Sequence, residues 1–244
     1  MPGYTRHQLK EDKFANAAKG TVSWAGHHQK LVSVASTVLL VAAALGVGGW
    51  VFLQWREQKA SFAMAGALRT YQRPLRPAGT PANPDFPSLA SLMERAKAAR
   101  TEFQAVADQY SYTRSGKIAR YYVGLTAMES GDTAAAEREL KAIADSGNKD
   151  LAPLGKLALA SLYRSQKRDA DAIQIYRQLI DNPSDSVPKA AAQLELASLY
   201  EEKQPAEAGK LYQQIRIEYP TSAAGQIASS RLTRLGIAGV PPPR

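Results

Sequence analysis

The sequence contains one long apolar run, from Leu31 to Leu53, in which no residue carries a charge. A helix of this length, at about 1.5 Å per residue, extends roughly 34 Å, and a bilayer hydrocarbon core is about 30 Å thick. Trp50 and Trp55 lie at the distal end of the run, and aromatic residues favour the membrane interface. The run therefore predicts a single transmembrane helix near the N-terminus.

Two other interpretations of the apolar run fit less well. A buried helix of a soluble protein is rarely apolar on every face over such a length. A cleaved signal peptide has a shorter apolar region of about 7–15 residues, closer to the start of the chain. The pattern Ala63-Met64-Ala65 has the small residues of a cleavage site, but it lies ten residues beyond the run.

The flanking charges do not fix the orientation of this helix. Basic residues lie near both ends in similar numbers, and the positive-inside rule favours neither orientation when the charges are so balanced. They are Lys13, Lys19 and Lys30 before the run and Arg56, Lys59, Arg69 and Arg73 after it. Within the run, Ala44 and Gly48 form a small-xxx-small pair, as do Ala42 and Gly46, and such pairs allow helices to approach closely. Self-association through the span therefore stays open.

The segments around the span define the domain layout. Residues 1–30 are basic, and their apolar residues recur at a spacing that indicates either a short interfacial helix or a partly disordered tail. Residues 54–87 start as a helical extension of the span (31–53). They continue as a linker with prolines at positions 74, 77, 81, 84 and 87, a spacing that no regular helix survives. Residues 237–244 form a proline-rich tail.

Residues 88–236 form a repeat domain, because the chain there resembles itself at a spacing of 36 or 37 positions. The segment Leu157–Tyr163, LALASLY, matches Leu194–Tyr200, LELASLY. Small and large residues recur downstream and upstream at equivalent places: Ala136 and Leu140, Ala172 and Tyr176, Ala208 and Tyr212, with Ala99, Phe103 and Val106 as a partial fourth copy. Such periods are typical of tetratricopeptide repeats.

The residue types suit a stack of antiparallel helix pairs. Small residues at Gly124, Ala160 and Ala197 allow the first helix of each pair to approach the second closely. The segment from Ser222 to Leu235 predicts a final helix that covers the exposed apolar end of the stack. The sequence thus predicts an all-α fold, with a single N-terminal transmembrane helix followed by a tetratricopeptide-type α-solenoid.

The chain lacks the usual chemistry of catalytic and metal sites. It contains no cysteine, and His7, His27 and His28 all precede the span. This excludes Ser–His and Cys–His pairs, and the usual zinc ligands, from the repeat domain. Acidic pairs such as Glu137 and Glu139 lie at helix starts or turns, where they suit the helix dipole. We therefore expect no enzymatic activity, no catalytic residues, no cofactor and no metal.

The net charge of +9 divides into +3 for residues 1–30 and +6 for residues 54–244. In the second segment both signs are spread along the chain, which is typical of solvated helices and does not predict specific nucleic-acid binding. The layout as a whole resembles the ancillary SecYEG translocon subunit family (YfgM-like) of bacterial inner membranes. The features that carry this resemblance are a basic N-terminus, one span ending in Gly48-Gly49-Trp50, a helix that continues out of it, a break, and about three repeats. The resemblance implies a single-pass inner-membrane protein with periplasmic repeats that work with the SecYEG translocon and periplasmic chaperones.

The repeats themselves predict a membrane-anchored adaptor that binds partner proteins in a groove lined by the first helix of each pair. In this register the groove residues are Tyr121, Leu125, Leu157, Ser161, Arg164, Leu194, Ser198 and Glu201. The alternative is a scaffold for the assembly of cell-envelope or division complexes. An adaptor that faces the cytoplasm and a membrane-bound hydrolase are further hypotheses, and the lack of His and Cys in the repeats argues against the hydrolase.

Overall fold

The computed structural model describes residues 28–81 and 88–237, and in these residues the fold is all-helical. The predictions for the N-terminal segment before residue 28 and for most of the proline-rich tail lie outside the described residues. The helices are α2 (Gln29–Tyr71), α3 (Leu92–Gln109), α4 (Arg114–Glu129), α5 (Thr133–Ala144), α6 (Leu151–Ser165), α7 (Asp169–Asp181), α8 (Lys189–Tyr200), α9 (Pro205–Glu218) and α10 (Ala223–Arg234). The predicted all-α fold class is confirmed.

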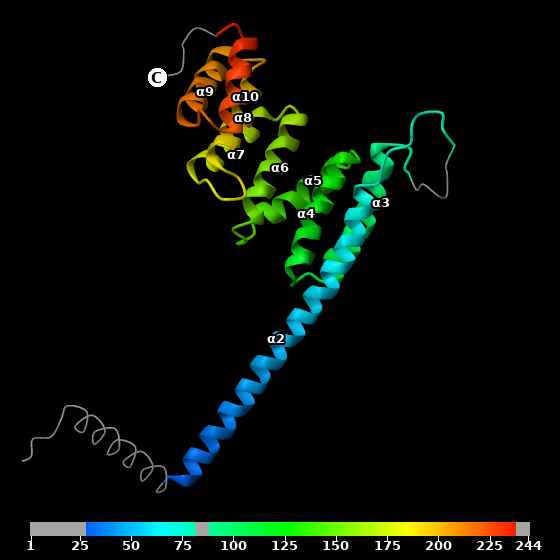
Figure 1. Cartoon of the computed structure of the whole chain (residues 1–244), viewed down its shortest axis with the longest axis vertical. Coiled ribbons are helices and arrows are strands. Elements are labelled where there is room, and N and C mark those ends of the chain that lie inside the picture. Colours follow the sequence, from blue (N-terminus) through cyan, green and yellow to red (C-terminus); the bar gives the residue numbers. More distant parts are fainter. Residues whose placement is uncertain (1–27, 82–87, 238–244) are drawn as a thin grey trace, which may run out of the picture. The chain divides into compact units, whose positions relative to one another are not determined.

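Helix α2 contains the apolar run and is long and apolar enough to cross a membrane (Figure 1). None of its most apolar stretch is buried in the structure. The hydroxyls of Ser33, Ser36 and Thr37 donate to backbone carbonyls of the preceding turn, at 2.9, 2.7 and 2.8 Å. These bonds satisfy the hydroxyl groups of the run within the helix itself.

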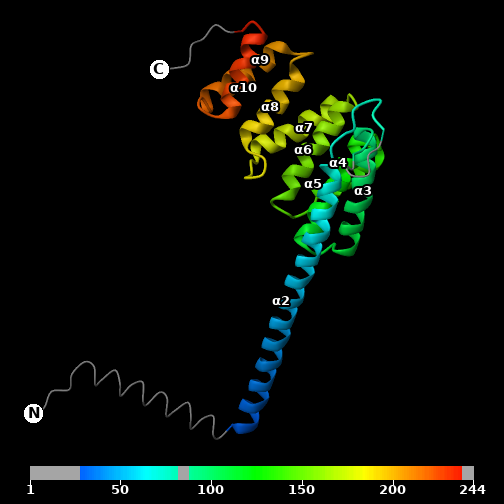
Figure 2. The same ribbon diagram turned by 45° about the vertical axis from the view of Figure 1, so that its right-hand side comes forward.

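The chain divides into two compact units, Met1–Trp55 and Arg56–Arg244. The last part of α2, residues 56–71, belongs to the second unit and lies alongside α3 (Figures 1 and 2). Its residues Ala60, Met64 and Ala67 are buried in one cluster with Phe103 of α3 and Val123 of α4. The structure places the helical extension of the span in the same compact unit, as the partner of α3.

The second helices of the repeats bury the same face in every copy. A small residue in α3, α5, α7 and α9 is fully buried, and a large residue one turn later is also buried. The small residues are Ala99, Ala136, Ala172 and Ala208, and the large ones are Phe103, Leu140, Tyr176 and Tyr212. Because each alanine exposes 0% of its surface, its position leaves no room for a larger side chain.

The first helices show the matching feature. Ala160 of α6 and Ala197 of α8 are fully buried, and Gly124 takes the equivalent place in α4. A Cβ added at Gly124 would lie 2.7 Å from Leu140 Cδ2 of α5, which is closer than side chains pack. Each helix packs on the next, from α3 through α10, and α10 buries Ala228 and Leu232 against the main core as the predicted final helix. Figures 1 and 2 show this succession.

Two turns between repeats have the same construction. Thr113, before α4, accepts a hydrogen bond from the Gly116 amide at 3.0 Å, and Ser222, before α10, accepts one from the Gly225 amide at 3.1 Å. Such bonds satisfy free amides of the first helical turn. A Cβ on Gly116 would lie 1.9 Å from the carbonyl oxygen of Tyr110, and a Cβ on Gly225 would lie 2.0 Å from the carbonyl oxygen of Tyr219. Both positions therefore require glycine.

The two ends of the proline-rich linker are hydrogen-bonded to each other. The amide of Arg76 donates to the carbonyl of Leu89 at 2.8 Å, and the amide of Leu89 donates to the carbonyl of Pro74 at 3.2 Å. Leu75 and Leu89 form an isolated parallel bridge. The linker therefore leaves α2 and returns to α3 at nearly the same place.

We predict that Gly116→Ala destabilises the repeat domain by about 1–3 kcal/mol, because backbone atoms that cannot move aside meet the new methyl group. The measurement is the urea midpoint of the full chain in detergent, followed by circular dichroism. Gly66→Ala is the matched control: this helical glycine has open space around the added Cβ, and alanine should stabilise the helix by roughly 0.5–1 kcal/mol. Equal midpoints for the two variants would refute the steric argument.

We also predict that Ala172→Leu lowers stability by about 1–3 kcal/mol through overpacking between α6 and α7. Ala170→Leu, in the first turn of the same helix, introduces the same side chain at an exposed position and should change the midpoint little. Thermal melting of both variants checks the prediction. A wild-type melting curve for Ala172→Leu would mean that the assigned register of the repeats is wrong.

Candidate partner-binding surface

The eight predicted groove residues lie on the first helices of three successive pairs. Tyr121 and Leu125 belong to α4, and Leu157, Ser161 and Arg164 belong to α6. Leu194 and Ser198 belong to α8, and Glu201 caps its C-terminal end. All eight are half-exposed, so each has surface that a partner could contact. We call this set the predicted groove surface.

The four apolar residues of this surface also support the core. Tyr121, Leu125, Leu157 and Leu194 pack partly buried against the main hydrophobic cluster. The ring of Tyr121 also lies edge-on to Tyr122, with 5.8 Å between the ring centroids. Burial raises the pKa of the Tyr121 hydroxyl, with a further contribution from Tyr122, so the side chain is neutral at physiological pH. These residues offer a partner apolar contact on one side while the other side holds the fold.

Arg164 connects two neighbouring first helices. Its guanidinium donates to Ser198 Oγ at 3.1 Å and lies 3.6 Å from a carboxylate oxygen of Glu195, both on α8. Ser161, one turn before it, donates to the carbonyl of Leu157 in its own helix at 3.1 Å. The structure therefore brings Arg164 and Ser198 together.

Glu201 is engaged within the protein itself. Its carboxylate accepts a hydrogen bond from the hydroxyl of Tyr212 at 2.6 Å and pairs with Arg231 at 3.3 Å and Arg234 at 3.2 Å. Burial and this hydrogen bond raise the pKa of Tyr212 well above its usual range. Glu201 thus ties α8 to α9 and α10, and its side chain is only 18% exposed. A partner that reached it would compete with these contacts.

A polar hollow of about 370 Å³ opens beside the predicted groove surface. Its lining includes Ser161 and Arg164 together with residues that sequence reasoning did not assign to a site: Ser165, Lys167, Asp169, Leu199, Glu202 and Lys203. These come from the ends of α6 and α8, from the turns that follow them, and from Asp169, the first residue of α7. The repeat spacing was the signal that would have placed these segments side by side.

The lining of this hollow carries charges of both signs. The ammonium of Lys203 pairs with Asp169, which raises the pKa of Lys203. Lys167 adopts a left-handed backbone conformation with φ of 61°, so it marks a sharp turn between α6 and α7. The hollow can therefore offer hydrogen bonds and charges of both signs to a peptide. Among the described residues, no group of three or more His, Cys, Asp or Glu side chains could hold a metal ion.

Comparison with known proteins agrees with this architecture. A family model described as a tetratricopeptide repeat-like domain matches residues 23–178, which include both the apolar run and the first repeats. A second model, described as a tetratricopeptide repeat, matches residues 191–222, where α8 and α9 lie. No curated protein and no solved structure matches the chain. Because the first match covers more than half of the sequence and the stacked helix pairs agree with it, this chain belongs to the tetratricopeptide repeat-like domain family.

Proposed function

We propose that this protein is a single-pass membrane adaptor that holds a partner protein on its repeat domain. The observation that carries the proposal is the predicted groove surface, in which equivalent positions of three successive first helices stay half-exposed beside a polar hollow. Stacked repeats use such surfaces to bind extended or helical peptides. Tetratricopeptide repeat families are typically interaction scaffolds, and the match to them supports binding as the activity.

The membrane anchor rests on α2. Its apolar stretch is uncharged, unburied and long enough to span a bilayer, which is a costly surface to leave in water. A stretch with these properties near an N-terminus is also compatible with a signal sequence, so a test has to distinguish the two.

The location and partners follow from the family resemblance of the layout. We place the protein in a bacterial inner membrane with its repeats in the periplasm, where the partners would be the SecYEG translocon and periplasmic chaperones. The adaptor would then aid the trafficking or folding of periplasmic proteins.

The alternative is a scaffold that organises cell-envelope or division complexes. One observation favours it: Gly46 and Gly49, three residues apart on one side of α2, have nothing within 4 Å of an added Cβ, so this side allows a close approach by another helix. Self-association through α2 would support this role.

For the anchor, we predict that the intact chain stays in the membrane fraction after carbonate extraction and keeps an N-terminal tag. Protease added to spheroplasts should digest a C-terminal tag and leave a protected N-terminal fragment. The double variant Leu40→Arg/Val41→Arg should become extractable, because each charge at the centre of a span costs about 2.5–3.5 kcal/mol.

The matched control is Gln29→Arg/Gln54→Arg, which adds the same charge at the two ends of the run and should stay in the membrane. Loss of the N-terminal tag from mature protein would mean that the run is a signal peptide. Full protection of the C-terminal tag until lysis would place the repeats in the cytoplasm.

For the binding surface, we predict that a photoreactive amino acid at Ser161 or Ser198 crosslinks a partner in vivo. The same amino acid at Gln174, an exposed position of α7, should not. Crosslinks to translocon subunits or chaperones would support the adaptor at the secretion machinery, and crosslinks to division or cell-wall proteins would favour the scaffold. Equal crosslinking from all three positions would contradict a specific groove.

A further inference from the structure

The turn between α3 and α4 presents an aromatic side chain to solvent from a rigid frame. Tyr112 is 91% exposed, whereas its neighbours Tyr110 and Thr113 are buried. Thr113 is fixed by its hydrogen bonds to the carbonyl of Tyr110 and to the amide of Gly116. Tyr112 is therefore exposed in a turn whose flanking residues are held in place by burial and hydrogen bonds.

This turn is attached to the residues that directly follow the apolar run. The guanidinium of Arg56 donates to the carbonyl of Gln109 at 2.6 Å and lies over the ring of Tyr110, 5.1 Å from its centroid. The carboxylate of Glu57 accepts hydrogen bonds from the amides of Arg114 at 2.7 Å and Ser115 at 3.1 Å. Glu57 thereby caps the start of α4, which supplies a negative charge where the helix dipole favours one.

Chain connectivity sets the depth of this turn relative to a bilayer. Arg56 follows Leu53 by three residues within α2, so it lies about 4.5 Å farther along the helix axis. The headgroup region on each side of the hydrocarbon core is roughly 5–8 Å thick. When α2 spans the bilayer, a turn that contacts Arg56 directly therefore lies in the headgroup region or at its edge.

The side chains at this end of the repeat domain suit that environment. Tyrosine favours the interface because its ring is apolar and its hydroxyl is polar. Arg114 and Lys117, in the first turns of α4, are exposed, and neither forms an ion pair with another of the described residues. Their charges are available to lipid phosphates, and cations near an anionic leaflet are attracted to it.

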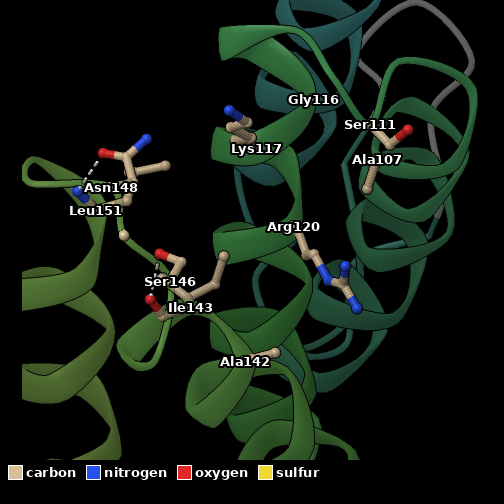
Figure 3. Close-up of a pocket in the computed structure, with 11 residues that line it drawn as sticks. Ala107, Ser111, Gly116, Lys117, Arg120, Ala142, Ile143, Ser146, Asn148 and Leu151 are labelled. Carbon is tan, nitrogen blue, oxygen red and sulfur yellow. Dashed lines mark hydrogen bonds between the residues drawn. The ribbon is translucent and has the colours of Figure 1, made fainter.

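A hollow of about 470 Å³ adjoins the same turn. Its lining includes Ser111 of the turn, Lys117 of α4, and Ser146 and Asn148 of the segment between α5 and α6. Figure 3 shows the Lys117 side chain extending from α4 toward Asn148, while the Arg120 side chain turns the other way. Arg120 pairs with Glu139 at 3.1 Å, so of these two cations Lys117 is the one that stays available to a ligand at this hollow.

We propose that this end of the repeat domain is a lipid-contact surface, in which Tyr112, Arg114 and Lys117 contact the headgroups of the membrane that α2 crosses. The occupant is the anionic leaflet itself rather than a protein, because Arg56 and Glu57, which contact this turn, follow the apolar run in the same helix. The proposal rests on the membrane anchoring proposed above, and its test separates the two.

The test uses the full chain in vesicles that contain anionic lipid. The protein has no cysteine, so single cysteines can be labelled without background. Tyr112→Cys carries an environment-sensitive fluorophore, Gln54→Cys reports on the anchor, and Lys97→Cys, about 18 Å before Gln109 along α3, is the matched control. Lipids with a spin label near the headgroup quench a fluorophore that they contact.

We expect quenching at Tyr112→Cys and Gln54→Cys of about twofold, and little quenching at Lys97→Cys, because only the first two lie at interfacial depth. Quenching at Gln54→Cys alone would overturn the lipid-contact surface and leave the anchor intact. No quenching at either position would overturn both proposals. Equal quenching at Lys97→Cys would also overturn the surface, because the contact would not be confined to this end.

The roles of Arg114 and Lys117 are tested in the labelled Tyr112→Cys variant. Arg114→Gln with Lys117→Gln should lower the quenching in anionic vesicles and weaken its dependence on salt, because exposed charges are screened. Lys97→Gln should leave both unchanged. Quenching that does not respond to the double variant would overturn the role of Arg114 and Lys117.

Discussion

The close approach of paired helices is the constraint on which the rest of the repeat domain depends. In every pair, a fully buried alanine in the second helix, such as Ala136, Ala172 or Ala208, allows the first helix to pack directly over it. Gly124 makes the same approach possible on α4, where Leu140 fills the space that a side chain would need. Because each pair is amphipathic, it buries its remaining apolar face only by stacking on its neighbours. The order of the stack, its final helix and its exposed groove surface all follow from this packing.

The packing of the last part of α2 against α3 and α4 is a second constraint on the fold. Helix α2 is one continuous helix, and its last part is buried against α3 and α4 through Ala60, Met64 and Ala67. Arg56 and Glu57 then fasten the turn before α4 to the first residues beyond the apolar run. The compact repeat unit therefore begins within the same helix as the apolar run, with no linker between the two.

The candidate binding surface combines support of the fold with availability to a partner. Its leucines and Tyr121 contact the core, and Arg164 joins α6 to α8, so substitutions there affect both stability and binding. Glu201 has the strongest structural role of these residues, because Tyr212, Arg231 and Arg234 all contact its carboxylate. Substitutions at Ser161 and Ser198 should disturb the core least. Ser161 lines the polar hollow, and Ser198 accepts the hydrogen bond from Arg164, so these are the most informative positions for a probe.

The sequence by itself determined the features that depend on local pattern: the apolar helix, the repeat spacing, the small residues between paired helices and the final helix from Ser222. These follow from periodicity and residue size, which a linear chain displays directly. Only the tertiary structure decided that residues 56–71 pair with α3, that Glu201 is engaged by α9 and α10, and that Arg56 contacts the turn that carries the exposed Tyr112. Those outcomes depend on contacts between residues far apart in the chain, and the proline-rich insertion hides the spacing that would have aligned the end of α2 with the other repeats.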